Sequence, residues 1–439
     1  MNEPLKVAIA GLGTVGAGSF RALQVHGDLL AERCGRQLAI VAVSARDRSR
    51  DRGLNLKNVS WFDDPVQMAA EAKADVVVEL IGGADGIAKQ ICETAIAHGR
   101  HVVTANKALL AHHGLPLARL AEAKGVVLAY EAAVAGGIPI IKALREGLVG
   151  NRLQGVYGIL NGTCNFILTE MRRSGREFED VLKEAQAFGY AEADPSFDVD
   201  GVDAAHKLSI LAAVAFGCEL NFKSVYTEGI RHISALDIGY AEELGYRIKL
   251  LGMARLTDDG LEQRVHPCMV PLSASIAYVE GVDNAIVADG DFIESAMFEG
   301  RGAGAGPTAS AIVADLSDIA RGTRLPAFSV PAEKLAKIPS APMNRHKGPY
   351  YVRLMLVDRP GVIADVAAIL RDENVSMESM LQRRRAPGEP VPVVLTTHET
   401  REAEMRQALE KIASLDTVVV APRMIRMITL SDASEQTNR

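Results

Sequence analysis

Three glycines near the amino terminus place the tightest constraint on how this chain can fold. Gly11, Gly13 and Gly16 form the pattern G-x-G-x-x-G directly after the apolar run LKVAIA (5–10) and before a segment of helical character. In a strand–turn–helix unit the first glycine permits a tight turn, the second lets the main chain approach a pyrophosphate, and the third lets helix and strand pack closely. The pattern therefore predicts a dinucleotide-binding domain, and the alternative is a glycine turn that binds nothing.

Further apolar runs with strand composition follow along the chain, and segments of helical character separate them. The predicted strands lie at 38–44, 75–80, 101–105 and 126–130, and the predicted helices between them lie at 87–99 and 115–125. Strands that are apolar on both faces and alternate with helices indicate a parallel sheet covered on both sides. Residues 1–150 are therefore predicted to form an α/β, Rossmann-type, doubly wound parallel sheet.

The chain has 439 residues, which is too long for one ordinary domain. Beyond the nucleotide domain, the sequence predicts an α+β catalytic and oligomerisation domain, a proline-rich linker, a module with the strand and helix order β-α-β-β-α-β, and a disordered tail. We expect the glycine-rich loop and helix at 300–322 to pack back on the nucleotide domain. The predicted boundaries of these four parts are 151–337, 338–349, 350–430 and 431–439.

Composition excludes several classes of function. The net charge is −7 and the basic residues form no long stripe, so the sequence argues against a nucleic-acid partner. No uncharged apolar run reaches the roughly 18 residues of a membrane span, and the first residues lack the pattern of a signal peptide. Five scattered cysteines indicate reduced thiols and a cytoplasmic protein. Cys164, within NGTCN, is the one candidate for a reactive thiol, and a structural role is the alternative.

An acidic stretch from Gly189 to Leu208 predicts a second site. A calcium loop of the EF-hand type is excluded because Lys207 stands where the bidentate glutamate would be needed. A solvated acidic turn remains open. Asp203 and Lys207 lie one helical turn apart on the predicted helix 202–216, so their side chains share a face. A lysine that faces a cleft in this way can donate a proton to a substrate oxygen while the aspartate orients it.

The pattern A-x3-G-Y-x3-D-P-x2-D-V-x-G-x-D-x3-K, from Ala185 to Lys207, resembles the signature of the homoserine dehydrogenases. The resemblance extends over nearly the whole chain, and residues 350–430 resemble an ACT domain. The motifs that carry it, in order, are GLGTVG (11–16), TANKALL (104–110), YEAAVAGGIPII (130–141), LNGTCNFIL (160–168), GAGAGPTASA (302–311) and DRPGVIADVA (358–367).

This resemblance implies interconversion of L-homoserine and L-aspartate 4-semialdehyde with NAD(P), in the route from aspartate to threonine, isoleucine and methionine. Lys207 matches the proton donor of the family. Asp203 and Glu192 match residues that hold the substrate hydroxyl and amino groups, and Gly189 lies at the same site. Asp198 matches a further acid of the family. Lys107 competes for the acid–base role and is expected to bind and polarise the substrate.

The choice of dinucleotide depends on the residues after the second strand, SARDRSR (44–50), where a carboxylate suits the ribose of NAD and arginine suits the 2′-phosphate of NADP. Arg46 and Arg48 favour NADP, Asp47 leaves NAD open, and solvated arginines are the alternative. The cofactor-binding residues that we expect are Gly11, Gly13, Thr14, Val15, Gly16, Arg46, Thr104, Lys107 and Gly304. The resemblance also implies a monovalent cation, expected to be Na⁺, held by Glu131 and by the carbonyls of Val134, Gly136 and Ile138.

The ACT resemblance implies threonine as an effector, bound where Gly361 and Val362 open a helix with free N–H groups. A dimerisation module without ligand is the alternative, and a homodimer or homotetramer follows from either. An amino-acid-sensing protein without catalysis and a dehydrogenase of another small aldehyde stay open, whereas a fused aspartate kinase is not expected, because the first predicted strand begins at residue 5.

Overall fold

A six-stranded parallel sheet forms the nucleotide domain, with the strand order β3-β2-β1-β4-β5-β6. The computed structural model describes residues 3–383 and 388–429, so the tail predicted at 431–439 lies outside the described residues. The strands are β1 (Leu5–Ala10), β2 (Leu38–Ser44), β3 (Ser60–Phe62), β4 (Val76–Glu79), β5 (His101–Thr104) and β6 (Leu128–Ala129). The order reverses between β1 and β4, and ligands of such sheets bind at the carboxyl ends of the strands near this point.

Helices cover both faces of this sheet because successive residues of each buried strand point to opposite sides. Ala8 packs with Met68 and Ile91 on one face, whereas Ile9 packs with Phe20 and Leu316 on the other. The helices are α1 (Thr14–Val25), α2 (Gly27–Cys34), α3 (Pro65–Glu71), α4 (Ile87–Ala97), α5 (Lys107–Ala123) and, from much later in the chain, α12 (Ala305–Arg321). The predicted Rossmann-type fold is confirmed.

Three elements differ from the sequence prediction. Helix α5 was expected at 115–125 but begins at Lys107, because the side chain of Asn106 accepts the N–H of Leu109 and caps the first turn. Pro116 therefore lies inside the helix. The strand expected at 126–130 is shorter than predicted, since β6 spans only Leu128–Ala129. The short strand β3 was not predicted, since three residues carry little periodicity.

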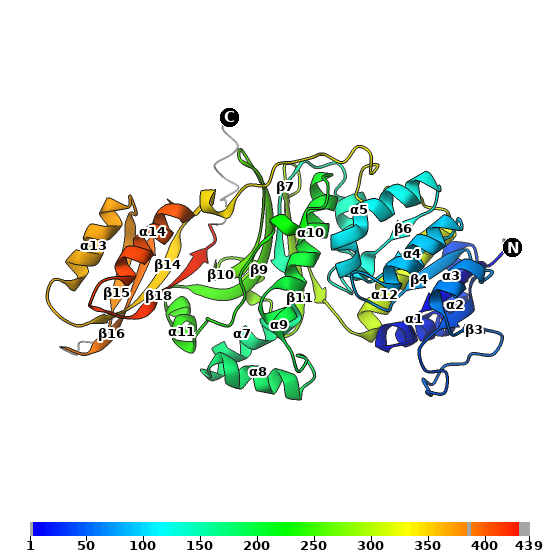
Figure 1. The fold of residues 1–439 in the computed structure, drawn as a ribbon, viewed down its shortest axis with the longest axis horizontal. Helices are drawn as coiled ribbons and strands as arrows, with labels where there is room; N and C mark the ends of the chain where they lie inside the picture. Colours follow the sequence, from blue (N-terminus) through cyan, green and yellow to red (C-terminus); the bar gives the residue numbers. More distant parts are fainter. Residues whose placement is uncertain (1–2, 384–387, 430–439) are drawn as a thin grey trace.

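The central domain is built on antiparallel strands with helices packed along one side (Figure 1). Its strands are β7 (Leu153–Ile159), β8 (Tyr226–Thr227), β9 (Tyr246–Thr257), β10 (Gly260–Pro271), β11 (Asp283–Gly290) and β12 (Glu294–Arg301). The short helix α6 (Ile140–Lys142) precedes this domain, whose helices are α7 (Gly162–Ser174), α8 (Phe178–Ala187), α9 (Ser196–Val199), α10 (Val202–Phe216) and α11 (Ala235–Glu243). Helix α8 ends at Ala187, and Gly189 adopts the left-handed conformation just after it.

The third unit has the predicted strand and helix order of an ACT domain. It consists of β14 (Tyr350–Val357), α13 (Val362–Asp372), β15 (Met377–Gln382), β16 (Pro390–Thr397), α14 (Glu402–Ala413) and β18 (Val418–Met427). Strand β18 pairs with β10 in parallel, with Cys268 opposite Arg426, so one sheet continues through the central and ACT domains. The short strands β13 (Lys347–Gly348) and β17 (Thr400–Arg401) pair with each other beside this junction.

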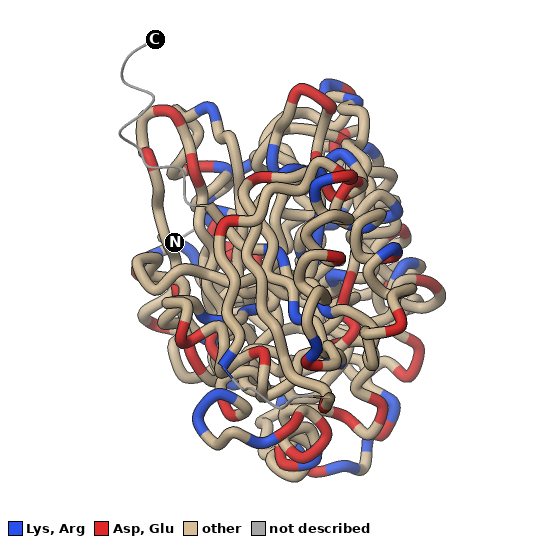
Figure 2. The backbone as a smooth tube through the Cα atoms, turned by 90° about the vertical axis from the view of Figure 1, so that its left-hand side faces the viewer, with Lys and Arg blue, Asp and Glu red and all other residues tan. Residues whose placement is uncertain are grey.

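The surface carries both signs of charge. Figure 2 shows acidic and basic residues interspersed over the ACT end of the molecule, and neither sign forms a continuous stripe there. None of the helices in residues 3–383 and 388–429 combines the length and the apolar character that crossing a membrane requires.

Candidate active site

The glycine loop after β1 has the geometry that a pyrophosphate needs. Gly11 has a φ of +99°, and a Cβ there would lie 2.7 Å from the carbonyl oxygen of Leu80. A Cβ on Gly16 would clash with the carbonyl of Gly11, so that position also requires glycine. At Gly13, by contrast, an added Cβ would meet no heavy atom within 4 Å. The loop therefore leaves room beside Gly13, where α1 begins at Thr14, for an anionic group to approach the first N–H groups of the helix.

The segment after β2 presents arginines rather than a free carboxylate. The carboxylate of Asp47 accepts the main-chain N–H of Ser49 at 2.9 Å and its hydroxyl at 2.6 Å. These hydrogen bonds lower the pKa of Asp47 and commit the side chain to a local turn. Arg46 is exposed. Arg52, which nothing in the sequence singled out, donates to the carbonyl of Leu12 at 3.1 Å and so reaches the glycine loop.

Thr104 and Lys107 lie where β5 ends and α5 begins. The hydroxyl of Thr104 donates to the buried carboxylate of Glu79 at 2.7 Å and accepts the N–H of Asn106 at 3.0 Å. Glu79 also accepts the N–H of Ile81 at 2.7 Å. These contacts fix the turn from which Lys107 projects. Neither Glu79 nor Asn106 was selected from the sequence, although Asn106 lies inside the TANKALL motif.

Two lysines meet on one carboxylate. Lys207 donates to Oδ2 of Asp203 at 2.8 Å and to the carbonyl of Leu160 at 2.7 Å. The ammonium of Lys107 lies 3.0 Å from Oδ1 of the same Asp203. The Asp203 side chain is only 4% exposed, whereas that of Lys107 is 34% exposed, so the cluster opens to solvent on the Lys107 side.

The charges in this cluster support one another. Burial opposes ionisation of Asp203, but Lys207 and Lys107 outweigh it and hold the pKa of the carboxyl well below its usual range. Burial likewise opposes the charge on Lys107, yet the nearby Asp203 raises the pKa of that lysine. Both lysines are therefore held where a substrate oxygen could receive a hydrogen bond or a proton.

Asn161 joins a second acid to the cluster. Its side-chain amide nitrogen lies 2.8 Å from Oδ2 of Asp203 and 2.8 Å from Oδ1 of Asp198, and its oxygen caps α7 by accepting the N–H of Cys164. Burial, and then the charge of Asp203, raise the pKa of Asp198. Two neighbouring carboxyls with pKa values pushed apart are typical of catalytic sites. The motif LNGTCNFIL contains Asn161, but its role depends on contacts with residues about forty positions later and so could not be predicted locally.

Glu192 and Gly189 lie outside this hydrogen-bonded cluster. Gly189 closes α8, and Glu192 is exposed in the loop that leads to α9. The loop runs beside the cluster, because the hydroxyl of Thr163 lies 2.8 Å from the carbonyl oxygen of Tyr190 and 3.2 Å from Oδ2 of Asp198.

The remaining residues of the acidic stretch have structural partners. Asp194 accepts the N–H of Ser196 at 3.1 Å, and Asp200 forms an ion pair with Arg231 at 2.5 Å. Cys164 is buried, its thiol donates to the carbonyl of Asp198, and burial raises its pKa well above the usual value. A thiol of this kind is a poor nucleophile at neutral pH.

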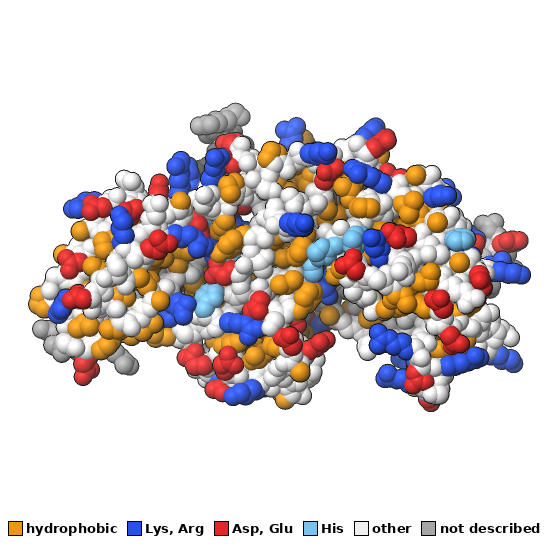
Figure 3. Space-filling model, viewed as in Figure 1, with side chains coloured by type: hydrophobic (Ala, Val, Ile, Leu, Met, Phe, Trp, Pro, Cys, Tyr) orange, Lys and Arg blue, Asp and Glu red, His pale blue; other side chains and the backbone are white. Residues whose placement is uncertain are grey.

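A histidine pair lies next to the cluster. The rings of His206, on α10, and His112, on α5, lie 5.4 Å apart, and Figure 3 shows histidine side chains gathered where the nucleotide and central domains meet. Burial, followed by the charge of His112, lowers the pKa of His206 to about 4. His206 is therefore neutral at pH 7 and supplies no positive charge there.

The loop from Glu131 to Ile138 and the glycine-rich loop lie in contact. Ala135 and Gly136 both have positive φ angles, and a Cβ on Gly136 would clash with the carbonyl of Gly302. Both carboxylate oxygens of Glu131 are used, since they accept the N–H groups of Ile141 and Lys142 at 2.9 Å. Each oxygen accepts one N–H and keeps a lone pair, so a cation held here could use Glu131 together with main-chain carbonyls. In the described part of the chain, no group of three or more His, Cys, Asp or Glu side chains could hold a metal ion.

Gly304 precedes α12 with a φ of +119°. A Cβ on Gly18 of α1 would lie 2.9 Å from the carbonyl of Ala305, so the first turns of α1 and α12 are packed together. This brings the glycine-rich loop to the same side of the nucleotide domain as the G-x-G-x-x-G loop.

Three comparisons with known proteins agree with this arrangement. Residues 11–131 match the NAD-binding domain of homoserine dehydrogenase, residues 139–317 match the homoserine dehydrogenase family, and residues 350–416 match the ACT domain. The chain is 45% identical to the homoserine dehydrogenase of Neisseria gonorrhoeae over 98% of its own length and 100% of that protein.

Solved structures give the same result. A homoserine dehydrogenase from Thiobacillus denitrificans is 46% identical and superposes with a TM-score of 0.91, over 97% of this chain and 98% of that one. A hyperthermophilic archaeal homoserine dehydrogenase in complex with NADPH is 25% identical with a TM-score of 0.61, over 73% of this chain and 99% of that one. A nicotinamide cofactor is thereby supported for a Rossmann-type domain that carries the expected glycine loop. The chain belongs to the homoserine dehydrogenase family.

Proposed function

We propose that the cluster of Asp203, Lys207 and Lys107 is the catalytic centre of this homoserine dehydrogenase. The observation that carries the proposal is the pair of ammonium groups on one buried carboxylate, at the boundary between the nucleotide and central domains. When bound, the dinucleotide supplies the hydride to the aldehyde carbon of L-aspartate 4-semialdehyde, or accepts it from L-homoserine. The protein must then deliver a proton to the resulting oxygen, or remove one from the hydroxyl.

Lys207 is the proposed proton donor. Its contacts with Asp203 and the Leu160 carbonyl fix the direction of two of its N–H bonds and leave the third for a substrate oxygen. Lys107 is proposed to bind and polarise the same oxygen, because its raised pKa keeps it charged and its position at the start of α5 places it on the open side. Asp203 orients both lysines and accepts the substrate hydroxyl.

The other substrate contacts are proposed at the edge of the cluster. Glu192 and Gly189 lie in the loop held by Thr163, where an exposed carboxylate suits the ammonium group of the substrate. Asp198 is proposed to support Asp203 through Asn161, which contacts both carboxylates.

NADP is proposed as the preferred dinucleotide. The carboxylate of Asp47 is occupied by Ser49 and so is poorly placed to accept ribose hydroxyls. Arg46 is exposed beside it, and Arg48 and Arg52 each lie 5.9 Å from the ring centre of Trp61, so several guanidinium groups surround the region where a 2′-phosphate would bind. Around the glycine loops, we assign Thr14, Val15, Thr104 and Gly304 to the same dinucleotide.

A monovalent cation, Na⁺, fits the loop at 134–138 if main-chain oxygens are its ligands. Consecutive positive φ angles at Ala135 and Gly136 change the direction of neighbouring carbonyls within a short span. We assign Glu131 and the carbonyls of Val134, Gly136 and Ile138 as the donors. A weakly charged, oxygen-seeking cation would support the contact between this loop and Gly302.

The proposed domain boundaries are those expected from the sequence, 1–150, 151–337, 338–349 and 350–430. For the ACT domain we propose threonine as effector at the turn of Gly361 and Val362, and a homodimer or homotetramer as the assembly.

All five cysteines are unpaired and buried, in keeping with a cytoplasmic enzyme.

The proposal is tested by steady-state oxidation of L-homoserine with NADP and with NAD, on the wild type and on Lys207→Met and Lys107→Met. We expect Lys207→Met to lower kcat by roughly 100-fold or more. Lys107→Met should raise the KM for homoserine more than it lowers kcat. Near-normal kcat in Lys207→Met would transfer the proton-donor role to Lys107 or water, and faster turnover of another small alcohol by the wild type would overturn the substrate assignment.

A further inference from the structure

One short segment, residues 226–231, connects the ACT domain to the proposed substrate site. It begins with β8, whose Tyr226 and Thr227 pair in parallel with Arg264 and Val265 of β10. The same strand β10 pairs on its other part with β18 of the ACT domain. The segment therefore lies beside the junction of the two domains, and it continues from there to the acidic stretch.

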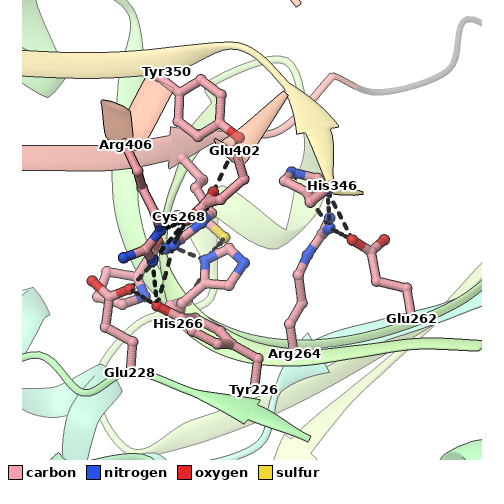
Figure 4. A network of polar contacts seen from close by, with 12 residues as sticks. Tyr226, Glu228, Glu262, Arg264, His266, Cys268, His346, Tyr350, Glu402 and Arg406 are labelled. Atoms are coloured by element: carbon pink, nitrogen blue, oxygen red, sulfur yellow. Dashed lines mark hydrogen bonds and ion pairs between the residues drawn. The ribbon is translucent and has the colours of Figure 1, made fainter. Parts of the chain in front are cut away.

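At the junction, Arg426 of β18 holds this segment by an ion pair. The residue is only 2% exposed. Its guanidinium donates to both carboxylate oxygens of Glu402, at 2.9 and 2.5 Å, and its third nitrogen donates to Glu228 at 2.8 Å. Tyr226 donates to the same oxygen of Glu228 at 2.9 Å, and Arg406 donates to Tyr226 at 3.0 Å. Figure 4 shows Tyr226 and Glu228 facing Glu402 and Arg406 across this network.

The ion pairs of this network cross the boundary between the two domains. Arg426 pairs with Glu402 of the ACT domain and with Glu228 of the central domain, whereas Arg406 pairs with Glu402. Glu402 is fully buried, and its main-chain N–H donates to the carbonyl of His346 at 2.8 Å. The side chain of Glu228 is 26% exposed, and its other oxygen lies 3.1 Å from Nε2 of His232. Arg426 itself is buried, so loss of the Glu228 contact would leave its remaining N–H groups unpaired, and this cost favours keeping Glu228 against it.

The other end of the segment packs directly against the turn Val199–Gly201. Ile230 donates its N–H to the carbonyl of Val199 at 2.9 Å. A Cβ on Gly229 would clash with that carbonyl and would lie 2.5 Å from Cα of Asp200. Main chain therefore lies directly against main chain, and little relative movement is possible without displacing the turn.

This turn lies between the two acids of the proposed site. Asp198 precedes it at the end of α9, and Asp203 follows it in the first turn of α10. Gly201 makes the turn with a φ of +86°, and a Cβ there would lie 3.1 Å from the methyl group of Thr227. A displacement of residues 199–201 would therefore move Asp203 relative to Asn161 and Lys107, which come from other elements.

We infer that Arg426 is a positioning residue for the substrate site. It acts through Glu228 and the segment 226–231, so that the seating of the ACT domain on β10 determines where the turn Val199–Gly201 lies. This inference rests on the proposed site at Asp203, Lys207 and Lys107. Disturbing the junction between the ACT and central domains should therefore weaken substrate binding. It should leave dinucleotide binding unchanged, because the glycine loop belongs to a different domain.

A second ion pair across the same junction provides a matched control. Arg353 of β14 donates to the buried Asp237 at 2.6 and 3.1 Å. Asp237 belongs to the first turn of α11, where it forms a capping box with Ser234. The Asp237 carboxylate contacts Ser234, Tyr351 and Arg353, and these residues lie outside the 226–231 segment. Loss of this pair should weaken the junction without moving the turn.

The test uses the full chain with Arg426→Gln, Glu228→Gln and Arg353→Gln. For each variant, kcat and KM are measured for homoserine and for NADP, together with the thermal midpoint. We expect Arg426→Gln and Glu228→Gln to raise the KM for homoserine by about 10-fold, since displacements below 1 Å are costly in such sites. The KM for NADP should change by less than about twofold, and the double variant should be no worse than the single ones, because both act through one contact.

A merely structural role gives a different result. In that case kcat would fall in proportion to the loss of folded enzyme, both KM values would stay unchanged, and the inference would be overturned. An equal rise of the homoserine KM in Arg353→Gln would overturn it as well. If Arg426→Gln does not fold, the homoserine KM of Glu228→Gln tests the inference instead, because that substitution removes the charge and keeps the shape of the side chain. Failure of the proposed site would appear separately, as normal turnover in Lys207→Met.

Discussion

Lys107 and Lys207, from different domains, are held on opposite oxygens of the Asp203 carboxylate, at 3.0 and 2.8 Å. A single side chain thus sets the distance between the two ammonium groups. Any displacement of the nucleotide domain relative to α10 would change the Lys107 contact while leaving the Lys207 contact, which lies within one helix, intact.

Substitution of Asp203 by asparagine should therefore cost both stability and activity. Two ammonium groups would lose their counter-charge, and we expect the free energy of unfolding at pH 7 to fall by roughly 3 kcal/mol. Asp200→Asn is the control, since its ion pair with Arg231 is exposed and should contribute less than about 1 kcal/mol. Urea unfolding of both variants, together with homoserine turnover, provides the measurement.

The effect of Asp203 should also depend on pH. Its folded-state pKa is lowered, so its contribution is present above the unfolded pKa of about 3.9 and is lost as the pH falls toward the folded value. The difference in stability between wild type and Asp203→Asn should accordingly shrink between pH 5 and pH 3. A difference that stays constant over this range would contradict the charge-based account.

Asp315 should show the opposite pH dependence. Burial, and then the charge of Glu131, raise the pKa of this carboxyl to about 7. The folded state therefore binds the proton more tightly than the unfolded state, and wild-type stability should fall as the pH rises from about 4 to 7. Asp315→Asn keeps an oxygen acceptor for the N–H of Glu131, and it should gain stability relative to wild type between pH 5 and pH 8. Urea midpoints at both pH values measure this gain.

Arg46 should contribute to the binding of NADP and not to the binding of NAD. If it contacts the 2′-phosphate, Arg46→Ala should raise the KM for NADP by about 10-fold or more and leave the KM for NAD within about twofold, since an Arg–phosphate contact is a strong, charge-assisted one. Arg371→Ala, an exposed arginine of the ACT domain paired with Asp372, is the control and should change neither value. Equal changes for NAD and NADP would mean that Arg46 contacts a part common to both.

Gly16 should not tolerate even one methyl group. A Cβ there would clash with the carbonyl of Gly11, so Gly16→Ala must displace α1 from the glycine loop and should abolish measurable NADP binding. Gly27 is the matched control, because a Cβ at its position would meet no atom within 4 Å. Gly27→Ala should bind NADP normally. Titration with the reduced form, NADPH, followed by its fluorescence, distinguishes the two variants, and tight binding by Gly16→Ala would refute the steric account.

Much of the fold and part of the site follow from local patterns. Helix 202–216 was predicted with its observed limits, and Asp203 and Lys207 could be paired in advance because residues four apart in a helix lie on one face. The glycine loop was equally predictable, since its steric demands involve neighbours in the same turn or strand.

Only the tertiary structure decided which distant residues join this pair. Lys107, Asn161 and Asp198 reach Asp203 because α5, α7 and α9 begin or end beside α10, and no local periodicity encodes such packing. The same holds for the Glu131 carboxylate, which helix α6 uses for its own N–H groups, and for Arg426, whose contact with Glu228 depends on the pairing of β18 with β10. The sequence determined the local chemistry of each segment, whereas the packing of segments far apart in the chain determined which charged groups lie in contact.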